Sequence, residues 1–188
     1  MAYLDSEILN KDMDWFVKIN QHYIHAASAG GMIPTVIYEN DEKNKSLARA
    51  IKHMPSLFKE EEIEINPFLR QILHLEEQQE ELSFVLSACN ISYENNPIDT
   101  YIKRIYCYSF MKFAQKGFLS FDKTDINNFN DSEYHLVARP RVEGNDNIIE
   151  LPSSFILNEI SINENIRQWQ SISLVDIIDR LNFFRKAE

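Results

Sequence analysis

The chain has 188 residues, of which 44% are hydrophobic and 12% aromatic, so it carries enough apolar surface for a folded core and is not expected to be disordered. Its formal net charge is −10, with the acid concentrated in the first half, and such a surface repels phosphate backbones. A nucleic-acid partner is therefore not expected. The four glycines form no phosphate-loop, dinucleotide-binding or nucleophile-elbow motif, and the zincin motif is also absent from the sequence.

Cysteine usage and the lack of long apolar runs predict the cellular setting. Cys89 and Cys107 form no CxxC pair and lie in apolar segments, which predicts two buried free thiols in a reducing compartment. The first ten residues lack the basic region of a secretory leader, and no stretch approaches the roughly 20 apolar residues that cross a bilayer. A cytoplasmic protein with no membrane-spanning segment is expected, and no cofactor is expected.

Two strands are predicted near the start of the chain. Residues 14–19 are rich in strand-favouring types, and their alternation places Trp15, Val17 and Ile19 on one face. Residues 33–38 are predicted to form a second strand, with Pro34 at its edge because proline lacks a backbone donor. The two strands are expected to pair as a hairpin with a long connection.

Helical patterns dominate the next hundred residues. A helix is predicted over 41–53, and residues 60–64 are expected to be a charged linker, with a weak domain boundary near 56–66 inside a single domain of residues 1–188. Asn66 is a predicted N-cap, with Pro67 in the first turn. Two apolar stripes follow on either side of the acidic run 76–81, and they predict either one long helix or two shorter ones.

Residues 98–116 are predicted to form the central core element. The segment ends at Gly117, a residue suited to a helix C-cap, and its apolar residues are not confined to one face, as in a buried helix. A strand over 105–113 is the alternative, because tyrosine, isoleucine and phenylalanine also favour strands.

The last third of the chain is predicted to form strands and one helix. Strands are expected over 118–121, 134–142 and 148–151, with a turn at 144–147. A C-terminal amphipathic helix is expected to start at Ser173, with Asp176 as its capping-box partner. Its apolar stripe comprises Leu174, Ile177, Ile178, Leu181 and Phe184. Because strands and helices are clustered, the predicted fold class is α+β: a small, mostly antiparallel sheet packed by about four helices.

The first candidate site lies around the glycine pair. His22, His25 and Ser28 occur at a spacing of three residues and precede Gly30 and Gly31, which permit unusual backbone angles or a close approach to a ligand. On a helix the three side chains would share one face and could form an acid/base cluster, whereas on a strand His22 and His25 would point to opposite faces. No metal is expected, because a third strong ligand is missing at a recognisable spacing.

The second candidate site is a cationic strand face. In 134–142 a period of two places His135, Arg139 and Arg141 on one side, where two guanidinium groups could hold a carboxylate or a phosphate. The alternative is an ordinary salt-bridged surface that involves Glu143, Glu150 or acids of the first half of the chain.

Carboxylates provide a weaker signal. The glutamate runs 60–64 and 76–81 are typical of solvated surfaces. Asp122 and Asp125, which follow a predicted strand, are the acids retained as candidates for proton transfer.

Two hypotheses of function follow. The first is a non-catalytic, cytoplasmic binding or regulatory protein that recognises another protein through an acidic, aromatic-containing surface. The second is a small-ligand-binding protein or enzyme acting on an anionic substrate, with the Gly30-Gly31 loop as one wall and Arg139 and Arg141 holding the anion. A protein partner is favoured over a small molecule, because the sequence lacks catalytic motifs.

Overall fold

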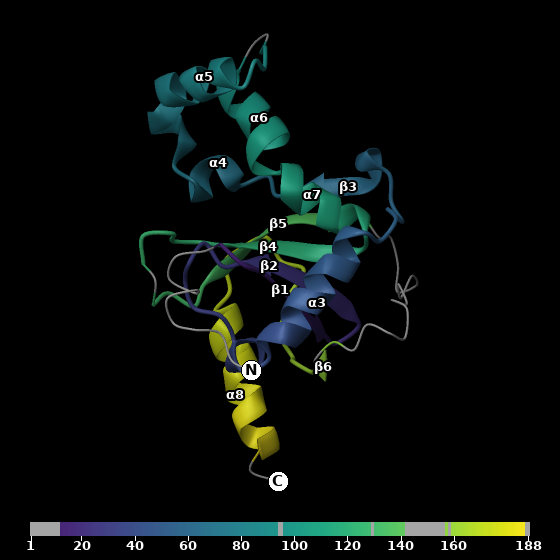
Figure 1. Cartoon of the computed structure of the whole chain (residues 1–188). Helices are drawn as coiled ribbons and strands as arrows, with labels where there is room; N and C mark the ends of the chain where they lie inside the picture. Colours follow the sequence, from purple (N-terminus) through teal and green to yellow (C-terminus); the bar gives the residue numbers. More distant parts are fainter. Residues whose placement is uncertain (1–11, 94–95, 129, 142–156, 158, 187–188) are drawn as a thin grey trace.

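A computed structural model describes residues 12–93, 96–128, 130–141, 157 and 159–186 (Figure 1). Its centre is a six-stranded mixed sheet with the strand order β3-β5-β4-β2-β1-β6. The strands are β1 (Asp14–Ile19), β2 (His22–Ala27), β3 (Ile63–Ile65), β4 (Phe118–Lys123), β5 (Tyr134–Pro140) and β6 (Glu159–Ile160). Three neighbouring pairs are antiparallel, whereas β1–β6 and β2–β4 are parallel. The α+β class predicted from the sequence is confirmed.

The helices surround this sheet and include a separate lobe. The α-helices are α2 (Thr35–Tyr38), α3 (Asp41–Lys52), α4 (Leu69–Ile72), α5 (Gln79–Ala88), α6 (Pro97–Tyr101), α7 (Tyr108–Gln115) and α8 (Leu174–Lys186). Two 3₁₀-helices, η1 (Glu60–Glu62) and η2 (Leu75–Gln78), and a π-helix, η3 (Ile102–Tyr106), complete the set among the described residues. Figure 1 shows α4, α5 and α6 as a lobe that projects beyond the sheet, at the end of the molecule opposite α8.

The two faces of the sheet are covered by different helices. Trp15, Val17 and Ile19 lie on the face that packs against α2 and α8, which confirms the alternation predicted for β1. Phe16, on the opposite face, packs against α3 and contacts the ring of Phe113 in α7. A third cluster joins α7 and the far end of the sheet to α4, α5 and α6.

The second strand of the hairpin was wrongly placed by the sequence pattern. Residues 33–38 contain the short helix α2, and Pro34 immediately precedes its first residue. Proline lacks a backbone N–H, but at the start of a helix this group has no partner within the helix, so no hydrogen bond is lost. The strand that pairs with β1 is instead β2, reached through a tight turn in which Asn20 has a φ of 54°. Because β2 pairs with β1 on one side and β4 on the other, these long-range pairings override the low strand propensity of its two alanines.

Several other expectations are corrected by packing. Residues 60–64 are not a linker, because they form η1 and enter β3, which pairs with β5. The helix expected to begin at Asn66 begins instead at Leu69, and the Asn66 side chain donates to the carbonyl oxygens of Leu136 and Trp169 at 2.7 and 3.1 Å. The acidic run lies in η2 and α5, so the two apolar stripes belong to separate helices.

The core segment is helical, which decides between its two predicted forms. Asn96 accepts a hydrogen bond from the Ile98 N–H at 2.8 Å and caps α6, and Gly117 has a φ of 95° after α7. The expected burial on all sides is wrong, since Tyr108 and other outer-face residues of η3 and α7 are exposed. Cys107 is buried as predicted, but Cys89 is exposed.

The C-terminal helix is present as α8. The side chains of Leu174, Ile177 and Ile178 are buried, while those of Leu181 and Phe184 lie outside the described part of the structure. The strand predicted over 148–151 and the turn over 144–147 also lie outside the described residues. Within the described ranges, no helix combines the length and the apolar character needed to cross a membrane.

Candidate functional site

The histidine cluster predicted before the glycine pair does not form. His22 and His25 lie on the extended strand β2, and an odd spacing on a strand directs their side chains to opposite faces. Burial and the charge of Arg167 lower the pKa of His22, so neutral imidazole is favoured there. Ser28 is also buried, and its hydroxyl oxygen accepts a hydrogen bond from the Met13 N–H at 3.0 Å.

His25 instead joins two polar side chains that are distant in sequence. Its Nδ1 lies 2.7 Å from Oγ of Ser120, which is its register partner on β4, and its Nε2 lies 2.8 Å from Oδ1 of Asp14 on β1. The chain thus contains a serine, a histidine and an aspartate linked by hydrogen bonds. Sequence inspection missed this arrangement, because three different strands supply the three residues.

This Asp14–His25–Ser120 group is built to hold the sheet rather than to attack a substrate. In serine hydrolases Nε2 receives the serine proton and Nδ1 faces the carboxylate, whereas the two nitrogens are exchanged here. Ser120 is 0% exposed and His25 is 1% exposed, and the imidazole stacks on the ring of Phe113 with 3.7 Å between centroids. A substrate carbonyl therefore has no access to Oγ of Ser120.

A second polar group lies where β4 and β5 face η3. Asp122 and His135 are register partners on the two strands, and the hydroxyl of Tyr106 lies 2.7 Å from Oδ2 of Asp122 and 3.0 Å from Nε2 of His135. Burial raises the pKa of Asp122 to about 7, with a smaller contribution from the charge of Asp12. Burial lowers the pKa of His135 to about 4, and it raises the pKa of Tyr106 well above its usual value.

These hydrogen bonds continue as a chain that has two proton arrangements. Nδ1 of His135 lies 3.4 Å from the Thr124 hydroxyl, and the Thr124 and Ser171 hydroxyl oxygens are 3.0 Å apart. When Asp122 is ionised, Tyr106 donates to it and His135 donates to Tyr106 through Nε2. When Asp122 is protonated, it can donate to Tyr106, and every donor in the chain reverses. The arrangement can therefore store and shift one proton within the core.

The glycine loop is packed against β4. Gly30 has a φ of 73°, and the Gly31 N–H donates to the Ser28 carbonyl oxygen at 2.8 Å. A Cβ at Gly31 would lie 2.5 Å from Cε of Lys123, whose buried ammonium group donates to the carbonyl oxygen of Asp131. The close approach that the glycine permits is thus to a lysine of the protein itself.

Replacing Gly31 by Ala is expected to lower the free energy of unfolding by about 1–3 kcal/mol, because the added methyl group overlaps the Lys123 side chain. Urea denaturation measures this change. If the overlap is the cause, the same substitution costs less in a Lys123→Ala background. An equal cost in both backgrounds would show that Lys123 is not responsible.

The arginines predicted to hold an anion are directed to a carboxylate of the protein. Glu64 lies on β3, and its Oε2 is 2.8 Å from Nε of Arg139, while its Oε1 is 3.5 Å from Nε of Arg141. Arg139 also stacks on the ring of Trp169, with Cζ 3.9 Å from the centroid. The structure brings the two arginines together, as the period predicts, but it places His135 with Tyr106 and Asp122 instead. This geometry fits the salt-bridged alternative, with Glu64 as the partner.

An exposed surface with a different chemistry lies on α5. Phe84 is 75% exposed, Val85 and Ala88 are also exposed, and helical spacing places Glu80 and Glu81 one turn before Phe84 and Val85. We refer to these residues (Glu80, Glu81, Phe84, Val85 and Ala88) as the α5 surface. The opposite side of the helix buries Leu82 and Leu86 in the lobe. The α5 surface therefore combines a large apolar ring with negative charge.

Asp125, the second retained acid, does not accompany Asp122. Its carboxylate accepts a hydrogen bond from the Asn127 N–H at 2.9 Å in an exposed turn. In the part of the chain that the structure describes, no three histidine, cysteine or acidic side chains are grouped so that they could hold a metal ion.

Comparisons with known proteins add no further assignment. No protein-family model matches the chain, and searches of curated proteins and of solved structures found no similar protein.

Proposed function

We propose that the protein is a non-catalytic binding protein that recognises a protein partner through the α5 surface. The observation that carries this proposal is the exposure of Phe84, 75% of whose surface faces solvent on a helix that buries only Leu82 and Leu86. Burying a phenylalanine side chain is worth about 1.5–3 kcal/mol, so a partner that covers this ring gains substantial affinity. Exposed aromatic residues of this kind are typical anchors of protein interfaces.

The charges around Phe84 define the partner's chemistry. Glu80 and Glu81 are exposed, and the adjacent η2 carries the further exposed acid Glu77. A complementary surface has an apolar pocket with lysine or arginine at its rim, since opposite charges steer association and suppress wrong partners. The acidic first half of the chain supports the same polarity. A reducing compartment such as the cytoplasm suits the two free thiols.

The exposed cysteine provides a direct test of this proposal. Cys89 lies one turn after Val85, whereas Cys107 is buried and burial raises its pKa to about 12, so a maleimide photocrosslinker modifies Cys89 selectively. Crosslinking in a lysate of the native host captures candidate partners. Each candidate is then purified and its affinity is measured for the wild type and the variants.

Phe84→Ala is expected to weaken binding of the captured partner by about tenfold or more, because the anchor ring is lost. The combined change of Glu80 and Glu81 to Gln is expected to weaken binding less and to flatten its salt dependence. Ile126→Ala is the matched control, since this residue is 59% exposed but lies between β4 and β5. Equal effects of Phe84→Ala and Ile126→Ala would refute the α5 surface as the recognition site.

A further inference from the structure

The π-helix η3 presents different chemistry on its two sides. Tyr106 points inward to Asp122 and His135, while Lys103 and Arg104 are exposed on the outer side. π-helical turns are rare and are frequent at functional sites, because the wider turn changes where successive side chains project. The outer side of η3 is therefore a place to search for a ligand.

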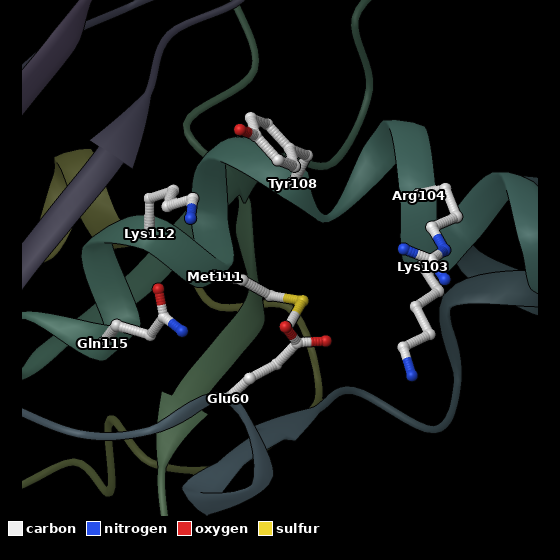
Figure 2. Close-up of a pocket in the computed structure, with 7 residues that line it drawn as sticks. All are labelled: Glu60, Lys103, Arg104, Tyr108, Met111, Lys112 and Gln115. Atoms are coloured by element: carbon white, nitrogen blue, oxygen red, sulfur yellow. The ribbon is translucent and has the colours of Figure 1, made fainter. Parts of the chain in front are cut away.

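A surface hollow of about 90 Å³ lies beside η3 and α7 (Figure 2). In Figure 2, Lys103 and Arg104 border it at one end and Lys112 and Gln115 lie toward the other, with Met111 between them and Glu60 across from the helix. Met111 is buried, whereas Tyr108 is 62% exposed at the rim. The lining thus combines an apolar base, an accessible aromatic ring and three cations.

The three cations of the hollow have no ion-pair partner among the described residues, a property they share with Arg49, Lys52 and Arg180 elsewhere on the protein. By contrast, Arg70 pairs with Asp99 and Glu76, as Arg139 and Arg141 pair with Glu64.

A further cation, Lys116, lies near Lys112 at one end of the hollow. Lys112 lies over the Tyr108 ring, with Nζ 5.4 Å from the centroid. Burial lowers the pKa of the neighbouring Lys116, and the charge of Lys112 lowers it further. The hollow is thus lined by three cations without an ion-pair partner among the described residues and by one carboxylate, that of Glu60.

We propose that this hollow binds the phosphate group of a small phosphorylated ligand, with Lys103 and Arg104 as the groups that contact its oxygens and Lys112 adding positive charge toward the other end. An arginine fork and lysine ammonium groups are the side chains that best bind phosphate. The exposed Tyr108 ring provides a wall on which a flat part of the same ligand can stack. The hollow accommodates one such group, and the net charge of −10 disfavours a long polyanion.

Glu60 allows a test in which removing a charge is expected to strengthen binding. Its carboxylate lines the hollow opposite the cations, so it repels a bound phosphate. Glu60→Gln is expected to tighten binding severalfold, whereas Arg104→Gln is expected to weaken it about tenfold. Glu61→Gln, in the same 3₁₀-helix but outside the hollow, is the matched control for the first change. Arg180→Gln, on the distant α8, is the matched control for the second.

Adenosine monophosphate, adenosine and inorganic phosphate are suitable probes, with affinity measured by calorimetry and location by amide chemical shifts of the full chain. Adenosine monophosphate is expected to bind with shifts confined to residues near 60 and 103–115, and more tightly than the other two probes. Binding that is equally strong for adenosine, or equally sensitive to Arg104→Gln and Arg180→Gln, would overturn the proposal. Tighter binding of a short single-stranded oligonucleotide than of adenosine monophosphate would also overturn it. The α5 surface is not involved, so this result is independent of the proposed protein partner.

Discussion

Replacing His25 by Ala is expected to lower the free energy of unfolding by about 3–5 kcal/mol, because it removes a large buried ring and leaves the buried hydroxyl group of Ser120 without its side-chain partner. The imidazole is 1% exposed, stacks on Phe113 and hydrogen-bonds to both Ser120 and Asp14. Urea denaturation of the wild type and the variant measures the loss. The substitution is expected to leave binding through the α5 surface unchanged.

A double-mutant cycle separates the hydrogen bond from the packing. The hydroxyl group of Ser120 hydrogen-bonds to His25 and loses this side-chain partner when His25 is removed. Because Ser120 is 0% exposed, water cannot replace the lost partner. Removing that hydroxyl by Ser120→Ala is therefore expected to cost less in the His25→Ala background than in the wild type. Additive effects, or a loss below about 1 kcal/mol for His25→Ala, would contradict the structural role assigned to this group.

Separate substitutions of His135 by Gln and Asp122 by Asn are expected to reveal opposite pH dependences of stability. Burial raises the pKa of Asp122 from 3.8 to about 7, so the folded state retains a proton that the unfolded state releases between these values. The stability contributed by Asp122 is therefore lost as the pH rises from about 4 to 7. His135→Gln removes the opposing histidine and exposes this falling dependence.

The contribution of His135 has the opposite sign. Burial lowers its pKa from 6.5 to about 4, so the unfolded state binds a proton that the folded state excludes between these values. The stability contributed by His135 is therefore lost as the pH falls from 6.5 to 4. In the Asp122→Asn variant, which lacks the opposing carboxyl group, stability is expected to rise with pH over this range. Each limiting slope is at most about 1.4 kcal/mol per pH unit.

Denaturant unfolding of both variants across pH 4 to 6.5 measures the two slopes. In the wild type the contributions offset one another, so its dependence over the same range is expected to lie between those of the variants. Conservative replacements keep a polar group beside Tyr106, which limits the loss of packing. Because His22 and Asp179 also have shifted pKa values and remain in both variants, the difference between the two slopes is the test. A slope for His135→Gln that is not more negative than the slope for Asp122→Asn would contradict the assigned directions of the pKa shifts.

The proposed recognition surface on α5 was only partly predictable from the sequence. The acidic run 76–81 is evident from composition, and it led to the hypothesis of an acidic interface. Leu82, Phe84, Val85 and Leu86 are all apolar, however, and nothing local says which of them face inward. Packing of α5 against α6 buries Leu82 and Leu86 and leaves Phe84 exposed.

The hollow beside η3 was not anticipated at all. Lys103, Arg104 and Lys112 were part of a segment expected to be buried on every side. A π-helical turn between α6 and α7 changes the register of the helical faces, and it directs Tyr106 inward while the cations remain outside. A strictly helical period does not describe such a turn, so the pattern cannot place these side chains.

The sequence alone determined the elements whose hydrophobic pattern is local: β1, α3, α8 and the α+β class. Such patterns depend on neighbouring residues, which determine which side of one element is apolar. The tertiary structure decided β2, β3 and the hydrogen bond between His25 and Ser120, because each depends on strands that lie far apart in the chain. Register between distant strands is fixed only when the whole sheet is assembled, and that assembly brings Ser120 of β4 to His25 of β2.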